Sequence, residues 1–194
     1  MALVLGLGNP GARYARTRHN VGFRALDTLV QRWKAAPAEA GPDYRAWAAR
    51  PAGRDVTLLQ PLTYMNESGR ALDTWRARHG FDPAGLLVVA DDVYLPLGMV
   101  RLRARGGSGG HRGLESIESA LGSREFARLR IGVGAAPGPE LREHVLEEFA
   151  DEEEKPAVEA VQHAADAVEC WIAEGLLAAM NRFNRRVRKE VSEP

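Results

Sequence analysis

The sequence predicts an α/β fold, a single domain in which helices cover both faces of a mixed, mostly parallel, twisted sheet. Short apolar runs of strand length alternate along the chain with longer segments in which apolar residues recur at helical spacing. With 194 residues, 45% of them hydrophobic, the chain can bury one substantial core. We expect the domain to occupy residues 1–186 and residues 187–194 to form a flexible tail.

The first half of the chain alternates strand and helix signals. An apolar run that ends in glycine predicts a buried strand, and apolar residues spaced three and four apart predict a helix. A glycine just past such a segment is a favoured helix end. The predicted elements are a strand at 2–7, a helix at 21–34, strands at 44–50 and 54–60 joined through Pro51-Ala52-Gly53, and a helix at 67–79 closed by Gly80.

The second half continues the alternation. The run LLVVADD reads as another buried strand, whereas GMVRLRAR alternates apolar and basic residues, as a strand with one solvated face does. The predicted elements are strands at 86–92, 98–105 and 128–134, a helix at 114–121 after the glycine loop GGSGG, and mostly helix beyond, acidic at 147–154 and basic at its end.

The composition excludes several classes of protein. No stretch is long and apolar enough for a membrane span, and the start of the chain lacks the features of a secretion signal, so we expect a cytoplasmic protein with no membrane partner. The single cysteine, Cys170, allows no internal disulfide. Although the net charge is zero, residues 1–112 carry seven more basic than acidic residues, and 113–194 the reverse. A basic face for phosphates and an ordinary uneven surface both fit these counts.

The stretch GLGNPG, residues 6–11, has the glycine spacing of a dinucleotide-binding turn and follows a predicted strand. A cofactor site also needs a helix that begins within the turn and an acidic residue about 20 positions further on. Here Pro10 and a polar loop precede the helix, and the later position falls within LDTLVQRW. The cofactor interpretation is therefore disfavoured.

The glycine loop GGSGG contains the spacing of a serine-hydrolase elbow around Ser108. An elbow serine normally follows a fully buried strand, whereas the preceding strand here is half basic. His144 and His163 follow in sequence, but both lie in acid-rich helical stretches that predict solvated surface positions. The simpler interpretation is a flexible loop whose backbone can approach a ligand.

A third group of residues is dispersed along the chain. Loops at the carboxyl ends of strands meet at one edge of an α/β sheet, so Asn9, His19, Asn66 and Asp91 could lie together. A histidine held by a carboxylate is a competent base towards water, and amide groups can donate to a developing oxyanion. Each residue also has a structural interpretation: His19 or Asn20 as a helix cap, Asn66 as the cap of the helix beginning at residue 67, and Asp91 as a turn residue.

Several stretches together resemble one known family. GLGNPG, YARTRHNVGF, PLTYMNESG, the strand ending at Asp91 with its following LPLG, GGSGGHRGL and RLRIGVG stand in the order and spacing of bacterial-type peptidyl-tRNA hydrolase, over about residues 1–185. The resemblance implies an esterase without metal or cofactor that cleaves the ester between a peptide and the 3′ end of tRNA. Its partner would be the acceptor end and phosphate backbone of peptidyl-tRNA, and we expect a monomer.

The resemblance also implies roles for individual residues. His19 corresponds to the general base and Asp91 to the carboxylate that orients it, while Asn9 and Asn66 correspond to amides that position the ester and stabilise the oxyanion. The remaining correspondences fall into two sets. Residues implied to contact the substrate are Tyr14, Asn20, Tyr64, Met65 and His111, and we expect Arg112 to reach the substrate or a phosphate. Residues implied to contact tRNA are Arg101, Arg103 and Arg130, and Arg105 and Arg142 could add to that surface.

Three positions depart from the family's usual pattern. Arg112 stands where asparagine is common, Tyr94 where a second aspartate is common, and Ser108 where histidine is common. Neither Tyr94 nor Ser108 touches the inferred pair of His19 and Asp91. Two rival functions are a serine esterase that uses Ser108 and an RNA-binding homologue without catalysis.

Overall fold

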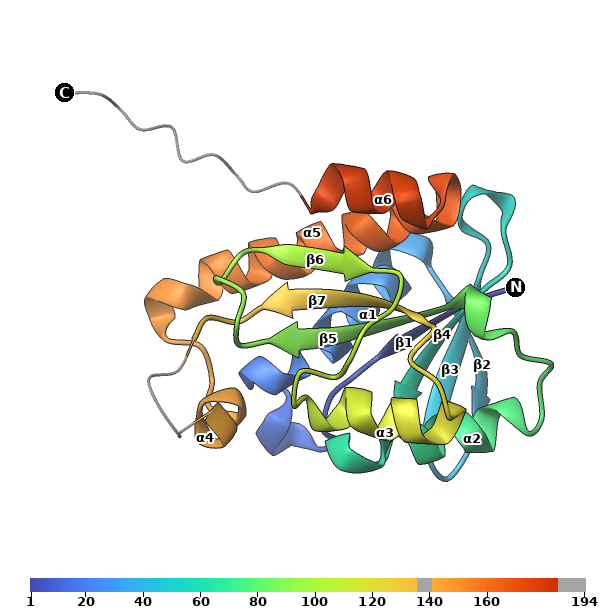
Figure 1. Ribbon diagram of the computed structural model, residues 1–194, viewed down its shortest axis with the longest axis horizontal. Coiled ribbons are helices and arrows are strands. Elements are labelled where there is room, and N and C mark those ends of the chain that lie inside the picture. Colours follow the sequence, from blue (N-terminus) through green and yellow to red (C-terminus); the bar gives the residue numbers. More distant parts are fainter. Residues whose placement is uncertain (136–140, 185–194) are drawn as a thin grey trace.

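A seven-stranded sheet runs through the molecule between two layers of helices (Figure 1). The computed structural model describes residues 1–135 and 141–184. The strands are β1 Ala2–Gly6, β2 Ala36–Ala40, β3 Tyr44–Ala49, β4 Val56–Pro61, β5 Leu86–Asp92, β6 Val100–Arg103 and β7 Ala127–Gly132. The α-helices are α1 Val21–Trp33, α2 Ser68–Arg76, α3 Arg112–Leu121, α4 Leu141–Leu146, α5 Asp151–Glu174 and α6 Leu176–Phe183.

The sheet is mixed, as predicted, with parallel pairing at its centre. The strand order is β2-β3-β4-β1-β5-β7-β6. The four central strands β4, β1, β5 and β7 run parallel, and the outer strands β3, β2 and β6 pair antiparallel with their neighbours. The carboxyl ends of β1 and β5 therefore lie side by side at one edge of the sheet.

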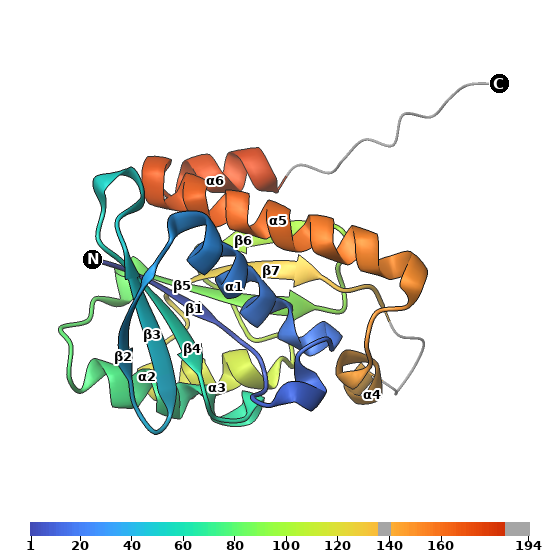
Figure 2. The same ribbon diagram turned by 180° about the vertical axis from the view of Figure 1, so that it is seen from behind.

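Helices cover both faces of the sheet, which confirms the predicted layers. In Figure 1, α5 and α6 lie above the sheet and α2 and α3 below it, and Figure 2 shows α1 on the same side as α5. Alternation within the strands sends side chains to both layers: Val4 packs towards α1 and α5, whereas Leu3 and Leu5 pack towards α2 and α3. Among the described residues, no helix is long and apolar enough to cross a membrane.

Most predicted elements are confirmed within a few residues, with two exceptions. The strand β2 was not predicted, because APAEA carries no β-branched or aromatic residue; it forms by antiparallel pairing with β3. The second helix begins at Ser68, after a 3-10 turn at Met65–Glu67, and its cap position, Glu67, makes no side-chain capping bond. The interpretation of Asn66 as the cap was therefore wrong. The predicted tail at 187–194 lies outside the described residues.

Two glycines, one just after β1 and one in the first turn of α1, let this helix pack tightly on the strand. A Cβ on Gly22 would lie 2.4 Å from the carbonyl oxygen of Leu7, and a Cβ on Gly8 would lie 2.6 Å from the ring of Phe23. Distances below 3.0 Å are not tolerated, so both positions need glycine. The glycines of GLGNPG thus set a close helix–strand approach, which places Asn9 at the edge of the sheet.

The free edge of β6 is covered at one residue by a side chain. The Oδ1 atom of Asn184 accepts the backbone N–H of Leu102 at 2.7 Å, and its Nδ2 atom donates to the carbonyl of Leu102 at 2.9 Å. Along its other edge, β6 pairs with β7, and Arg101 and Arg103 lie opposite Arg130 and Arg128. Directly paired residues share one face, so this antiparallel pair carries four arginines on the face away from α5.

Candidate active site

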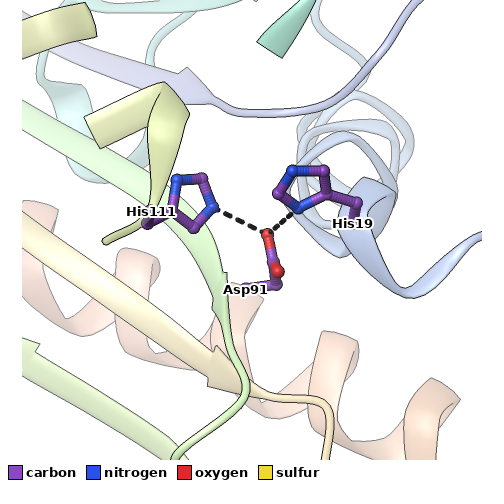
Figure 3. A group of neighbouring side chains, drawn as sticks. All are labelled: His19, Asp91 and His111. Carbon is purple, nitrogen blue, oxygen red and sulfur yellow. Dashed lines mark hydrogen bonds and ion pairs between the residues drawn. The ribbon is translucent and has the colours of Figure 1, made fainter. Parts of the chain in front are cut away.

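Two histidines meet one buried aspartate where β1 and β5 end (Figure 3). His19 lies in the 3-10 turn Arg18–Asn20 that precedes α1, Asp91 near the end of β5, and His111 directly before α3. The Nδ1 atom of His19 and the Nε2 atom of His111 each lie 2.8 Å from Oδ1 of Asp91. Segments more than 70 residues apart in sequence thus contribute to one cluster.

The hydrogen bonds determine which nitrogen of each ring carries the proton. In His111, Nδ1 accepts the backbone N–H groups of Gly113 at 3.1 Å and Leu114 at 3.2 Å, so the proton lies on Nε2 and is donated to Asp91. An ionised carboxylate can only accept, so His19 donates its Nδ1 proton to Asp91 as well. Its Nε2 atom is left with a lone pair, which is the arrangement of a general base.

Asp91 remains ionised although its side chain is only 2% exposed. Burial by itself raises the pKa of a carboxyl group, but the adjacent His19 and His111 rings and their hydrogen bonds outweigh this effect and hold the pKa of Asp91 well below its ordinary range. A permanent negative charge at this position holds the His19 ring in one tautomer and stabilises its protonated form.

The same three side chains have the composition of a metal site, with their ligand atoms within 4.8 Å of one another. A metal bound to Nε2 of His111 would require the proton to move to Nδ1. That nitrogen already accepts two backbone N–H groups, and a proton there would face two donors with no acceptor. The residues therefore fit a hydrogen-bonded cluster and do not fit a metal.

The side-chain oxygen of Asn9 is occupied by a hydrogen bond, so its NH₂ group is the part that can donate to a ligand. Its backbone N–H donates to Oδ1 of Asn20, and its carbonyl accepts from Nδ2 of Asn20, both at 2.9 Å. Its side-chain Oδ1 accepts the backbone N–H of Met65 at 2.8 Å, which fixes the orientation of the amide. Asn20 is 1% and Met65 4% exposed. In the described structure, Asn20 and Met65 hold Asn9, and both are buried.

The turn that carries His19 is braced by its neighbour Arg18. One guanidinium nitrogen of Arg18 donates to the carbonyl of Val133 at 3.2 Å, and another lies 2.5 Å from Oε2 of Glu153 in the first turn of α5. The same guanidinium stacks over Phe149, 4.7 Å from the ring centre. These contacts tie the turn that carries His19 to the end of β7 and to α5.

A cavity of ≈ 260 Å³ opens beside the His19–Asp91–His111 cluster. Its walls come from the end of β5, the last glycines of the glycine loop, the start of α3, and α4. The residues that line it besides the cluster are Asp92, Val93, Tyr94, Gly109, Gly110, Arg112, Arg130, Leu141, Arg142 and Val145. The predicted substrate residue Arg112 and tRNA residue Arg142 therefore share the cavity with His19.

The predicted tyrosines lie together, and Asn66 is exposed. The rings of Tyr14 and Tyr64 stand edge to face, 6.5 Å between centres, and Tyr64 is 52% exposed. Asn66 is exposed and makes no side-chain hydrogen bond to Asn9, His19 or Asp91 within the described structure. Of the predicted group of four, His19 and Asp91 are in direct contact, and Asn9 is joined to Met65, the residue directly before Asn66.

The predicted tRNA-contacting arginines differ in exposure. Arg101 and Arg103 are exposed on β6, and Arg105 is exposed with a carboxylate of Glu125 at 3.5 Å. Arg130 is 12% exposed and contacts Asp92 at 3.3 Å and the carbonyls of Gly107 and Ser108. Its guanidinium therefore holds the glycine loop to β5.

Sequence reasoning missed one residue and one contact that organise the site. Arg128 is 1% exposed and binds the carbonyl of Gly106 together with Glu118. The hydrogen bond of His111 to Asp91 was also missed, although a histidine directly before a predicted helix is a visible candidate for a cap.

Ser108 donates to Glu115 at 3.2 Å and accepts from the backbone of Gly110. Neither contact supplies the histidine base that a serine nucleophile requires.

Comparison with known proteins places the fold and these motifs in one family. A family model described as peptidyl-tRNA hydrolase matches residues 3–192. The peptidyl-tRNA hydrolase of Chloroflexus aggregans is 47% identical over 193 residues, covering 95% of this chain and 99% of the relative. That of Syntrophomonas wolfei is 43% identical, covering 95% and 100%. A crystal structure of the enzyme from Acinetobacter baumannii matches with a TM-score of 0.88 and 33% identity, covering 95% of this chain and 94% of that one. On sequence and structure alike, this chain belongs to the peptidyl-tRNA hydrolase family.

Proposed function

We propose that this protein hydrolyses the ester between a peptide and the 3′ end of tRNA, with His19 as the general base. Peptidyl-tRNA hydrolysis is the reaction of the family to which the chain belongs. The observation that carries the assignment of the base is the 2.8 Å hydrogen bond from Nδ1 of His19 to the buried, ionised Asp91, beside a cavity that His19 lines. This bond leaves Nε2 as the only ring nitrogen that can accept a proton.

In the first step, Nε2 of His19 takes a proton from a water molecule as the water oxygen attacks the carbonyl carbon of the ester. The ring becomes positively charged, and Asp91 stabilises that charge through its hydrogen bond with Nδ1. Asp91 is 2% exposed, so this stabilisation is not screened by solvent.

The tetrahedral intermediate places negative charge on the former carbonyl oxygen. Asn9 is the group that we assign to this oxygen, because Met65 already occupies its side-chain oxygen and leaves the NH₂ group to donate. The intermediate collapses when Nε2 of His19 returns its proton to the 3′ oxygen of the terminal ribose. The products are a free peptide carboxylic acid and tRNA with its 3′ hydroxyl, and no atom of the protein is consumed.

Arg101 and Arg103 are proposed to contact the phosphate backbone of tRNA. Both are exposed on the antiparallel pair β6–β7, where four arginines share one face. Like charges in such register disfavour folding, so an anionic partner would stabilise the arrangement. Contacts to phosphate carry no sequence information, as suits an enzyme that accepts many tRNAs. All of these groups come from one chain, and we propose that the protein acts as a monomer.

The function is tested with N-acetyl-aminoacyl-tRNA in the presence of EDTA, by following release of the N-acetyl amino acid. We expect the wild type to turn over and His19→Ala to lose about 10²–10⁴-fold in kcat, with tRNA affinity nearly unchanged. Ser108→Ala is the matched control and should retain activity. Tight tRNA binding without turnover by the wild type would contradict hydrolysis and support an RNA-binding function; a loss in Ser108→Ala as large as in His19→Ala would restore the serine mechanism.

A further inference from the structure

We propose that Arg112 and Arg142 form a cationic pair that selects peptidyl-tRNAs with an acidic side chain close to the scissile ester. The proposal rests on the proposed function and concerns the substrate class that the same site prefers. Arg112 is the first residue of α3, Arg142 lies in α4, and both line the cavity that His19 also lines. A group held by these arginines would therefore be adjacent to the reacting bond.

The charges inside the cavity leave these two arginines unmatched. The Asp91 carboxylate is already occupied by its two histidine donors, and Asp92 lies 3.3 Å from Arg130. Within residues 1–135 and 141–184, neither Arg112 nor Arg142 has a carboxylate within ion-pair distance. The cavity thus carries an excess of positive charge next to the base.

Arg112 has no evident role in stabilising its helix. A cation at the first position of a helix is disfavoured, because the N-terminal end already carries partial positive charge. The cap of α3 is supplied by His111, whose Nδ1 accepts the amides of Gly113 and Leu114. The helix end and the arginine therefore add their positive potentials, and an anion in the cavity would relieve both.

The remaining walls favour a peptide side chain over a phosphate. Val93, Leu141 and Val145 give the cavity apolar surface, against which the methylene groups of a glutamate can pack while its carboxylate reaches an arginine. A phosphodiester has no such apolar stem. Exposed arginines that suit phosphates lie instead on β6.

The test uses one tRNA body acylated with matched pairs that differ only in charge. N-acetyl-Glu is compared with N-acetyl-Gln, and N-acetyl-Glu-Ala with N-acetyl-Gln-Ala, for the wild type, Arg112→Gln, Arg142→Gln and the double variant. We expect kcat/KM to favour the acidic member of at least one pair by about three- to tenfold, because charge-assisted hydrogen bonds at a half-open site are worth that much. The preference should fall to about one in the double variant.

Arg50→Gln is the control, since it removes one positive charge from an exposed pair with Asp55 outside the cavity. It should keep the full acidic preference, and thermal unfolding should show that each variant folds. Equal kcat/KM for both members of both pairs in the wild type would overturn the selection. So would a rise in KM in the arginine variants that is the same for acidic and neutral substrates, because the arginines would then bind the nucleotide part. Absence of turnover on all four substrates would instead overturn the proposed function itself.

Discussion

The rings of His19 and His111 lie 5.1 Å apart and both donate a hydrogen bond to the same oxygen atom, Oδ1 of Asp91. The two histidines are therefore coupled through one buried charge. His19 keeps an available nitrogen, whereas both nitrogens of His111 are occupied. One ring is suited to accept a proton, and the other to hold the carboxylate.

Replacing the shared carboxylate tests its charge separately from its shape. In Asp91→Asn the side chain keeps its size but loses the charge that orients and stabilises the protonated His19 ring. We expect kcat to fall about 10²–10⁴-fold with little change in KM. Steady-state kinetics on N-acetyl-aminoacyl-tRNA measure this change. The neighbouring Asp92→Asn, which affects the pair with Arg130, is the control, and a comparable loss of kcat there would contradict a special role for Asp91.

His111→Asn should alter the pH dependence of the reaction without weakening the helix. Asparagine is a favoured helix cap and can still accept the amides of Gly113 and Leu114, but it is too short to reach Asp91. The charge of Asp91 would then act on His19 alone and favour its protonated form, which cannot serve as base. We expect the acid limb of the kcat/KM profile to move to higher pH.

His111→Ala is the comparison for this variant. It should show the same change in pH profile but lose an additional 0.5–2 kcal/mol or so in stability, because the cap is also removed. An unchanged pH profile together with a higher KM in both variants would mean that His111 contacts the substrate, as the family resemblance implies.

Asn9→Asp should distinguish the structural role of the side-chain oxygen from the proposed catalytic role of the NH₂ group. The new carboxylate can still accept the backbone N–H of Met65, but it no longer presents an NH₂ group to the substrate. We expect kcat to fall about 10²–10³-fold, as is typical when one donor to an oxyanion is removed. Asn181→Asp, the same change at an exposed position of α6, serves as the control. A normal kcat in Asn9→Asp would contradict the assignment of the oxyanion donor.

The ion pair between Arg18 and Glu153 should stabilise the fold in a pH-dependent way. Hydrogen bonding from Arg18 lowers the pKa of Glu153 below its usual value, with an opposing effect of partial burial. A carboxylate with a lowered pKa in the folded state stabilises the protein fully above its unfolded pKa, and this contribution is lost as the pH falls. The difference in Tm between wild type and Glu153→Gln should therefore be largest at neutral pH and shrink below about pH 4.

At neutral pH we expect Glu153→Gln to cost about 1–3 kcal/mol, less than for a fully buried pair because Glu153 is 30% exposed. For a domain of this size the loss corresponds to roughly 3–10 °C in Tm. Asp55→Asn, in the exposed pair with Arg50, should change Tm by no more than a few degrees. Equal shifts in the two variants would show that burial of Arg18 does not matter.

The exposed arginines of β6 should govern the salt dependence of tRNA binding. Each phosphate contact that is removed reduces the slope of log K against log salt by about 0.9 for a duplex. The double variant Arg101→Gln/Arg103→Gln should therefore lower the slope by about two and leave kcat at saturating substrate nearly unchanged. Arg50→Gln is the control for the loss of charge. A slope unchanged in the double variant would place the phosphate backbone elsewhere on the molecule.

Local patterns predict the central strands and α1 well, because buried parallel strands and amphipathic helices leave their periodicity in neighbouring residues. They place Asp91 at a strand end, and the resemblance supplies His19 and Asn9. The hydrogen bond between His111 and Asp91 depends on a tautomer that Gly113 and Leu114 impose through the fold, so no local pattern contains it. The role of Arg130 likewise follows from its register on β7 beside the glycine loop. Strand β2 forms because it pairs with β3, and its own residues carry no strand signal.

The side-chain amide of Asn184 protects the edge strand β6, which carries exposed arginines, from pairing with another molecule at Leu102. Arginines normally discourage the open edge of a sheet from pairing with another molecule, because their charges repel. That protection weakens when a polyanion neutralises them, which is when two copies bound to one RNA would come close. Asn184 satisfies both backbone groups of Leu102 through neutral hydrogen bonds, which do not depend on the charges nearby. The edge of β6 therefore stays blocked against intermolecular strand pairing at Leu102, whatever the state of the arginines beside it.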